Sequence, residues 1–216
     1  MSPLLWMAMV DGEKKKNKTR NFGHNKGIET VKLVVESCIN LKIPYVTFYV
    51  FSSENWKRPK KEISFLFKLI KSYFSQEIDD LLMQGIKINF LGELSKLPSD
   101  VKEVLKKTAL LTKKNKKIIV SLAINYGSRN EIIRTAKKMK RMNINDFKKN
   151  LDTKNIPDPD ILIRTGGYKR LSNFLLWQLA YTELFFLKKL WPDFKSSDLK
   201  NIIKKYFKIK RNFGSI

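Results

Sequence analysis

The chain has 216 residues, of which 43% are hydrophobic and 30% charged, and this composition suits one globular domain over residues 1–216 and excludes a disordered chain. Lysine and arginine outnumber aspartate and glutamate by 44 to 20, and the formal charge of +24 favours anionic partners: phosphorylated substrates, an acidic membrane surface or nucleic acid. A single cysteine, Cys38, excludes an intrachain disulfide, and no apolar run is long enough to span a bilayer, so we expect a cytoplasmic protein.

Short apolar runs alternate with longer amphipathic stretches along the chain. The apolar start is read as a buried strand and not as a signal peptide, because its lysines follow it. The predicted strands are Leu4–Val10, Tyr45–Phe51, Ile86–Leu91, Ile118–Ile124, Ile161–Ile163 and Leu184–Leu187. The predicted helices are Ile28–Leu41, Glu62–Met83, Ser99–Lys113, Ser128–Met142 and Asn173–Tyr181, with a last helix after Ser197. This alternation predicts an α/β fold with a mostly parallel central sheet and helices on both faces.

Polar residues and glycines follow the predicted strands. They are Asp11-Gly12, the segment 52–59, Gly92-Glu93, Asn125-Tyr126-Gly127 and Arg164-Thr165-Gly166-Gly167. Ligands of open α/β sheets bind beyond the carboxyl ends of the strands, so these residues should meet in one site. Glycine loops expose backbone amides and arginines make bidentate contacts, which together favour phosphate.

Two carboxylates stand at strand ends and are candidate magnesium ligands. Asp11 follows the first predicted strand and Glu183 precedes the last. Mg²⁺ is commonly held by one or two carboxylates together with substrate phosphates. Asp11 could equally be a turn or helix-capping residue, and Glu183 could be a surface acid.

Cations near the same strand ends form a candidate anion-binding set. Its members are Arg58, Arg164, Arg170 and the hydroxyl of Ser172. The single histidine, His24, lies close to Arg20 and is either a structural hydrogen-bonding residue or a further phosphate donor.

Two apolar stretches have an open role. One spans residues 174–179, and the other contributes Phe65, Leu66, Phe67, Leu69 and Phe74 to a long predicted helix. Such residues form either a packed core or the wall of a hydrophobic tunnel.

Several motifs are typical of one family. Residues 51–59 read F-S-S-E-N-W-K-R-P, and residues 164–178 read R-T-G-G-Y-K-R-L-S-N-F-L-L-W-Q. Shorter motifs are Phe22-Gly23-His24, Asn125-Tyr126-Gly127, Tyr181-Thr182-Glu183-Leu184, Trp191-Pro192-Asp193-Phe194 and the terminal Arg211-Asn212-Phe213-Gly214. Together they closely resemble the signatures of cis-prenyltransferases of the undecaprenyl diphosphate synthase type, in the same order and over nearly the whole chain.

The resemblance implies a fold and a reaction. The fold would be a parallel-sheet α/β homodimer with a hydrophobic tunnel. The reaction would condense isopentenyl diphosphate onto an allylic diphosphate, usually farnesyl diphosphate, to make a Z-polyprenyl diphosphate lipid carrier for cell-wall synthesis. The product would be released by transient contact with the inner membrane face, and nucleic acid would not be a partner.

The resemblance also assigns roles to residues. Asp11 and Glu183 would bind Mg²⁺, and Asp11 would assist departure of the allylic diphosphate. Asn55 would lie where the family's proposed proton acceptor lies, although a neutral amide is a weak base and the diphosphate is an equal candidate. Arg211 would reach the site of the partner subunit. The implied substrate-binding residues are Gly12, Glu13, Lys14, Lys15, Lys16, Arg20, His24, Ser52, Ser53, Glu54, Trp56, Arg58, Arg164, Arg170, Leu171 and Ser172.

The chain departs from the family pattern in two places. The family has D-G-N-G-R-W after its first strand, whereas here Asp11-Gly12 leads directly to Glu13 and the lysines 14–16, so N-G-R-W is deleted. Lysines supply charge without the planar fork of arginine. In addition, Tyr168 replaces a common acid. Three hypotheses follow: an active cis-prenyltransferase, a weakly active or accessory subunit that binds prenyl diphosphates, and a basic nucleic-acid binder.

Overall fold

A single parallel sheet organises the protein. The computed structural model describes residues 5–8 and 20–212, with side chains for residues 26–212. Within these residues the strands are β1 (Leu5–Ala8), β2 (Tyr45–Ser52), β3 (Ile86–Leu91), β4 (Ile118–Tyr126), β5 (Ile161–Arg164) and β6 (Glu183–Phe186). Their order is β3-β4-β2-β1-β5-β6, and every pairing is parallel. The predicted parallel α/β sheet is therefore confirmed.

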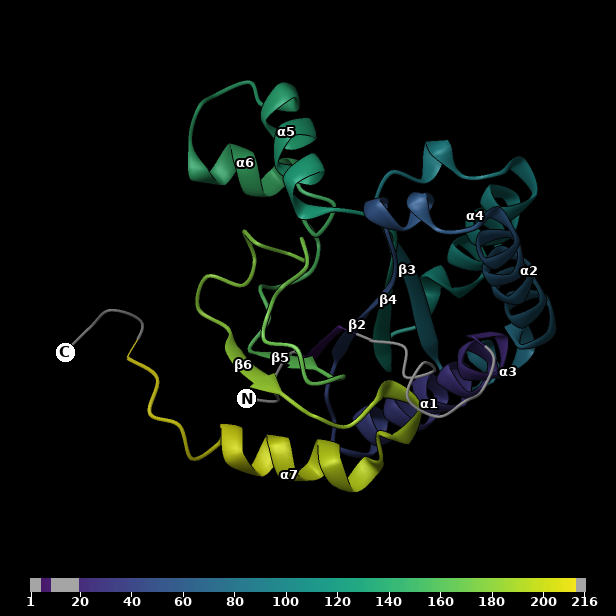
Figure 1. Ribbon diagram of the computed structural model, residues 1–216. Coiled ribbons are helices and arrows are strands. Elements are labelled where there is room, and N and C mark those ends of the chain that lie inside the picture. Colours follow the sequence, from purple (N-terminus) through teal and green to yellow (C-terminus); the bar gives the residue numbers. More distant parts are fainter. Residues whose placement is uncertain (1–4, 9–19, 213–216) are drawn as a thin grey trace.

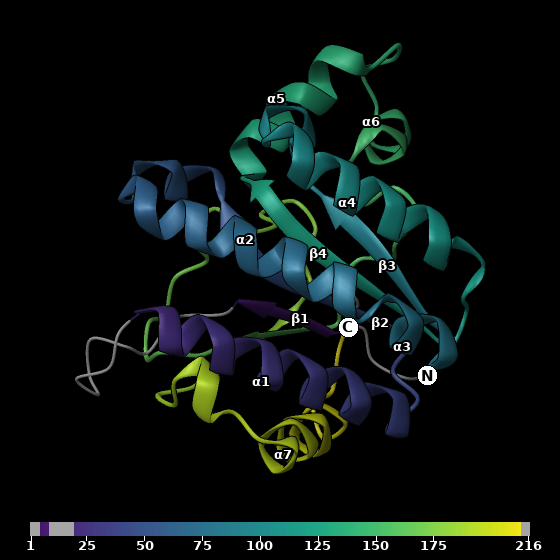
Figure 2. The same ribbon diagram turned by 90° about the vertical axis from the view of Figure 1, so that its right-hand side faces the viewer.

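Helices cover one face of this sheet. The helices are α1 (Arg20–Asn40), α2 (Lys60–Gln76), α3 (Ile78–Met83), α4 (Ser99–Leu111), α5 (Ser128–Lys138), α6 (Ile144–Asn150) and α7 (Ser196–Tyr206). The larger apolar core packs α1, α2, α4 and α7 against the strands, and Figure 2 shows α1, α2 and α4 lying across the sheet. Cys38 is fully buried in this core, and burial raises the pKa of its thiol to about 12. Cys38 is thus an unreactive core residue.

The opposite face is covered mainly by an irregular segment. The predicted helix Asn173–Tyr181 is wrong, because Ser172, Asn173 and Leu175 have φ values of 51°, 62° and 49°. A right-handed helix excludes positive φ. The apolar spacing in this segment instead reflects burial of Phe174, which stacks on the Tyr49 ring with centroids 4.3 Å apart. The segment is therefore shaped by its packing on the sheet.

Two other helical predictions need correction. The predicted helix Glu62–Met83 consists of α2 and α3, which are separated at Glu77 (φ −102°, ψ 7°). No glycine or proline marks this break. Helix α6 was not predicted, because it is short and buries little apart from Phe147. No helix in the described part of the chain combines the length and hydropathy needed to cross a membrane.

Candidate phosphate-binding site

The carboxyl ends of β1, β2 and β5 lie side by side. In the register of the sheet, Ala8 at the end of β1 pairs with both Tyr49 of β2 and Arg164 of β5. The chain turns to opposite sides of β1 at this place, which makes it the topological switch point of the sheet. The loops that follow β2, β4 and β5 therefore meet at one edge, where the sequence predicts a phosphate site.

Arg164 is a buried cation without an acidic partner. Only 5% of the residue is exposed, and no salt bridge joins it to a described carboxylate. Its Nη1 donates to the carbonyl of Arg170 and, at 3.0 Å, to Ser172 Oγ, while its Nε has no partner among the described groups. Burial, reinforced by the nearby charge of Arg170, lowers the pKa of this guanidinium. An anion bound here would compensate a buried charge that the protein leaves unpaired.

Arg170 and Ser172 complete the cationic group predicted after β5. The Arg170 guanidinium lies over the Tyr168 ring, 4.0 Å from its centroid, and both residues are exposed. This contact gives a role to the unusual tyrosine at position 168. An acid there would neutralise Arg170, whereas an aromatic ring orients the guanidinium by cation–π attraction and preserves its charge.

The loop after β2 is locked by side-chain hydrogen bonds. Asn55 Oδ1 accepts a hydrogen bond from the Ser52 amide at 3.1 Å and so holds a 3₁₀ turn over Ser53–Lys57. Glu54 accepts from Ser53 Oγ at 3.1 Å and from Asn173 Nδ2 at 2.7 Å. Partial burial opposes ionisation of Glu54, but these donors lower its pKa overall. The bond from Asn173 ties the loop after β2 to the segment after β5.

Asn173 and Gly127 join three loops. Gly127 was expected at this edge of the sheet, but neither residue was assigned a binding or catalytic role from the sequence. The Asn173 side chain accepts from the Arg129 amide at 2.8 Å, and its carbonyl accepts from the Ser128 amide at 2.8 Å, so it binds the first amides of α5. A Cβ added to Gly127 would lie 2.4 Å from Ser53 Oγ and 2.8 Å from Asn173 Nδ2. The three loops thus pack at contact distance, and only glycine fits between them.

Trp56 is fixed by Asn125, which was expected at this edge of the sheet but was not assigned a role from the sequence. Trp56 Nε1 donates to Asn125 Oδ1 at 2.8 Å, and Asn125 Nδ2 donates to the Glu93 carbonyl at 2.8 Å. Asn125 has φ 50°, a conformation that asparagine tolerates better than most residues. Its position near the end of β4, at the carboxyl edge, is the signal by which the sequence placed it in the site, although its bond to Trp56 was not predicted.

The other predicted site residues are placed as follows. Arg58 directly follows the 3₁₀ turn that carries Trp56, and its Nη1 pairs with Glu62 Oε1 at 2.9 Å. Leu171 is partly buried and packs against a second, smaller apolar core that contains Phe174. Arg20 and His24 belong to α1, but their side chains are outside the described set. Residues 11–16, which include Asp11 and the lysines, lie outside the described residues altogether.

Glu183 is not brought to Arg164 within the chain. It opens β6 and pairs with Ile161, whereas Arg164 at the other end of β5 pairs with Phe186. Three residues along a strand span about 10 Å, so Glu183 lies at the amino ends of the strands and Arg164 at the carboxyl ends. Glu183 Oε1 instead lies 3.9 Å from Nε of Arg211, which also binds Asp160 at 2.5 Å. Residues 26–212 contain no group of three His, Cys, Asp or Glu side chains that could hold a metal.

The buried carboxyl of Glu131 connects three segments next to the site by hydrogen bonds. Glu131 of α5 is fully buried and accepts three hydrogen bonds: from Tyr126 Oη at 2.5 Å, from Gln178 Nε2 at 3.1 Å and from the Asp152 amide at 2.9 Å. Burial raises the pKa of this carboxyl, although the donors to it act in the opposite direction. Glu131 therefore links β4, α5 and the segment that carries Asn173.

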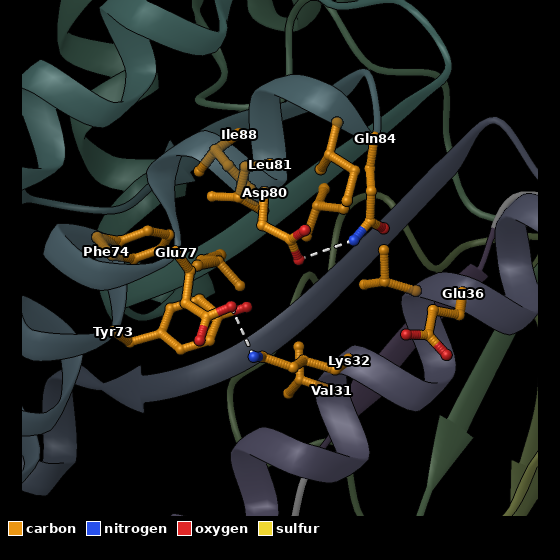
Figure 3. Close-up of a pocket in the computed structure, with 14 residues that line it drawn as sticks. Val31, Lys32, Glu36, Tyr73, Phe74, Glu77, Asp80, Leu81, Gln84 and Ile88 are labelled. Atoms are coloured by element: carbon orange, nitrogen blue, oxygen red, sulfur yellow. Dashed lines mark hydrogen bonds and ion pairs between the residues drawn. The ribbon is translucent and has the colours of Figure 1, made fainter.

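An apolar cavity opens on the helical face of the sheet. Its volume is about 540 Å³ including its open mouth, and its walls come from α1, α2, α3, β3 and β4. Val35, Phe74, Leu81 and Ile88 line it (Figure 3). Its rim is polar: Lys32 Nζ pairs with Glu77 Oε2 at 2.6 Å, and Gln84 Nε2 donates to Asp80 at 2.9 Å.

An aromatic group lies between this cavity and the phosphate loops. The ring of Trp56 packs on Phe51 and on Phe67, with centroid distances of 5.2 and 5.6 Å. Helix α2 extends from this group to Phe74, which lines the cavity. The long apolar helix predicted from the sequence thus contributes both to the packed core and to the wall of a cavity.

Comparisons with known proteins agree with this geometry. The family model of undecaprenyl diphosphate synthase prenyltransferases matches residues 11–214. The isoprenyl transferase of Clostridium perfringens is 42% identical over 214 residues, which cover 94% of this chain and 85% of the relative. That of Rickettsia typhi is 43% identical over 203 residues, covering 92% and 90%.

Solved structures have the same fold. The lavandulyl diphosphate synthase of Lavandula x intermedia, in complex with dimethylallyl diphosphate, aligns with a TM-score of 0.92 at 30% identity and covers 99% of both chains. A probable undecaprenyl diphosphate synthase from Campylobacter jejuni aligns with a TM-score of 0.87 at 33% identity and covers 100% of both. On its fold, its loop motifs and these relatives, the chain belongs to the undecaprenyl diphosphate synthase family of isoprenyl transferases.

Proposed function

We propose that the protein condenses isopentenyl diphosphate with an allylic diphosphate, farnesyl diphosphate being the expected starter, to make a Z-polyprenyl diphosphate. The observation that carries this proposal is the buried guanidinium of Arg164, which has an unpartnered Nε and no acidic partner in the described part of the chain. A buried charge of this kind is stabilised by a tightly bound anion. A diphosphate supplies that charge and several acceptor oxygens.

The roles of the loop residues follow from their contacts. Arg164, Arg170 and Ser172 bind the diphosphate of isopentenyl diphosphate, because they form one hydrogen-bonded group after β5. Asn55 and Trp56, held by Ser52 and Asn125, position the reacting carbons. Asn55 Oδ1 is already an acceptor for the Ser52 amide, so its first role is to fix the loop, and a diphosphate oxygen is the better acceptor for the proton.

The donor set fits magnesium bound together with substrate. Asp11 comes three residues after the end of β1, whose last residue, Ala8, pairs with Arg164. One carboxylate plus diphosphate oxygens is a sufficient ligand set for Mg²⁺. Bound Mg²⁺ would stabilise the negative charge that develops on the departing allylic diphosphate. The residues of the chain then hold both diphosphates in line, which is the larger part of the work in such a site.

A homodimer would give Glu183 a place in the site. Strand β6 is an edge strand with one unpaired side, and its exposed Leu184 is an apolar residue. Antiparallel association of two such edges would turn the amino end of one β6 toward the carboxyl end of the other. The Glu183 of one subunit would then approach the Arg164 edge of its partner, a distance that the single chain does not bridge.

The cavity on the helical face accommodates the growing hydrocarbon. Its apolar walls suit an isoprenoid chain. The packed rings of Trp56, Phe51 and Phe67 lie between the phosphate loops and this cavity. A long product of this kind is a lipid carrier, as cell-wall synthesis requires, and it would leave the protein at the inner face of the membrane. The shortened loop after Asp11 favours a second candidate, a weakly active or accessory subunit.

The test is chain elongation. The purified protein is incubated with Mg²⁺, farnesyl diphosphate and radiolabelled isopentenyl diphosphate, and the extracted products are separated by length. We expect labelled chains well beyond the starter and their loss in Asp11→Ala, with turnover retained in the control Asp158→Ala, whose surface acid pairs with Lys148.

The outcome separates the candidates. Absence of any product longer than the starter would contradict the proposed activity. Strong turnover only after addition of a partner chain would support the accessory role, whereas strong turnover by the protein alone would exclude it.

A further inference from the structure

The tip of the α5–α6 pair exposes large apolar side chains. Met142 is 88% exposed on the turn between the two helices, Ile144 is 63% exposed at the start of α6, and Ile133 is 56% exposed on α5. Residues 140–145 are all exposed. Apolar side chains at such a tip contribute nothing to the core, and exposed groups of this kind mark contact surfaces.

The same tip carries a dense positive charge. Residues 132–145 contain no acid and five cations: Arg134, Lys137, Lys138, Lys140 and Arg141. Arg134 pairs with Asp152 at 2.7 Å, but the other four form no salt bridge to a carboxylate within residues 26–212. The neighbouring Asp146 accepts hydrogen bonds from the Lys140 and Arg141 amides, which directs its carboxylate into the turn.

The spacing of these residues forms one face. Ile133 and Lys137 are four residues apart on α5, so they lie on the same side of the helix. Lys140, Met142 and Ile144 continue the surface through the turn. Cations that flank protruding apolar side chains match an anionic bilayer, where lysines bind lipid headgroups and apolar groups enter the interface.

The position of the tip agrees with this partner. Helix α5 begins directly after β4, at the carboxyl edge of the sheet where the phosphate loops meet. Figures 1 and 2 show α5 and α6 projecting from the body beyond the end of β4. A surface docked through this tip would lie on the same side of the molecule as the diphosphate site.

We propose that the α5–α6 tip, formed by Ile133, Lys137, Lys138, Lys140, Arg141, Met142 and Ile144, docks the protein on anionic phospholipid membranes. The inference rests on the proposed function only in that a prenyl diphosphate product must reach a bilayer. Binding to lipid is measured without substrate, so a failure of docking and a failure of catalysis are distinguished.

The chain offers a matched control at the opposite edge of the sheet. There the end of α4 exposes Leu110, at 68%, and is followed by Lys113 and Lys114, shortly before β4 begins at Ile118. This surface has similar chemistry but faces away from the phosphate loops. It should therefore contribute less to docking.

The experiment is co-sedimentation of the full chain with two kinds of vesicle, phosphatidylcholine alone and phosphatidylcholine with 30% phosphatidylglycerol, roughly the anionic fraction of an acidic leaflet. Three variants are compared: Lys137→Gln with Lys140→Gln, Met142→Ser with Ile144→Ser, and the control Leu110→Ser with Lys113→Gln and Lys114→Gln. Each lysine near an anionic surface strengthens binding about fivefold, so loss of two should weaken it about 25-fold. Loss of the two apolar side chains should weaken it about tenfold.

The outcomes are decisive. The proposal predicts binding only to anionic vesicles, large losses in both tip variants, and a control variant that binds like the wild type. All variants should keep the thermal unfolding midpoint of the wild type, which shows that they are folded. Equal binding to both lipids, unchanged binding of the tip variants, loss confined to the control, or binding of RNA with no binding of vesicles would each overturn it.

Discussion

Gly127→Ala is the most informative single change in the site. Gly127 has φ −155°, so its backbone accepts alanine without strain, and the whole effect must come from the added methyl group. That methyl would lie 2.4 Å from Ser53 Oγ and 2.8 Å from Asn173 Nδ2. To reach ordinary contact near 3.4 Å, these two atoms must retreat by about 1 Å and about 0.6 Å.

The retreat has a chemical cost because both atoms are already bonded. Ser53 Oγ donates to Glu54, and Asn173 Nδ2 donates to the other oxygen of Glu54. Moving them separates the loop after β2 from the segment that holds Ser172. A misplacement of about 1 Å in a catalytic site costs on the order of 100-fold in rate. Overpacking costs about 1–3 kcal/mol of stability, which a domain of this size tolerates.

The assay measures kcat/KM for isopentenyl diphosphate and the thermal unfolding midpoint. We expect Gly127→Ala to lower kcat/KM by about 10- to 100-fold while the protein remains folded at the assay temperature. The Ser53→Ala background provides the control, because it removes the atom of closest contact. Gly127→Ala should have a smaller effect there than in the wild type. Equal losses in the two backgrounds would contradict the steric argument about Ser53, and an unchanged kcat/KM would refute the reasoning as a whole.

Three other changes test separate parts of the structure. Arg164→Lys should raise KM for isopentenyl diphosphate about tenfold or more, because the ammonium group lacks the fork that reaches Ser172 and substrate together; an unaltered KM would count against the assignment. Leu81→Trp, which fills part of the cavity, should shift the product distribution toward shorter chains in the elongation assay, and unchanged lengths would show that the hydrocarbon lies elsewhere. Glu131→Ala removes the acceptor of three hydrogen bonds, although Gln178 Nε2 keeps Thr153 as a second acceptor, and should lower the free energy of unfolding in urea by about 3–6 kcal/mol, with about 1–2 kcal/mol for Tyr126→Phe; similar losses in both would show that the carboxyl does not act as a shared acceptor.

The sequence predicts the strands well for a physical reason. Strands buried on both faces must be continuous apolar runs, and these are visible without tertiary information. The segment 173–181 shows the limit of this reasoning. Its apolar residues have helical spacing, yet the backbone adopts positive φ at Asn173 and Leu175 in order to pack Phe174 on Tyr49. Such a conformation is decided by the sheet beneath it and leaves no local signal.

Some residues of the candidate site can likewise be predicted from the sequence, and others cannot. Residues that are charged and follow strands, such as Arg164 and Arg170, are predicted because the fold class brings those positions together. Asn173 and Gly127 were given no role because their function depends on loops from three different strands. Glu183 shows the opposite case, since its motif predicts a ligand whereas the register of β6 keeps it away from Arg164 within one chain.

The unpaired charge of Arg164 has a consequence beyond binding. Without bound substrate, the guanidinium of Arg164 is buried away from water and has no counter-ion among the described residues. This lowers the free energy of unfolding of the substrate-free protein. A ligand at 100 times its dissociation constant would add about 2.7 kcal/mol to the stability of the native state. A bound diphosphate substrate would therefore stabilise the folded protein against unfolding.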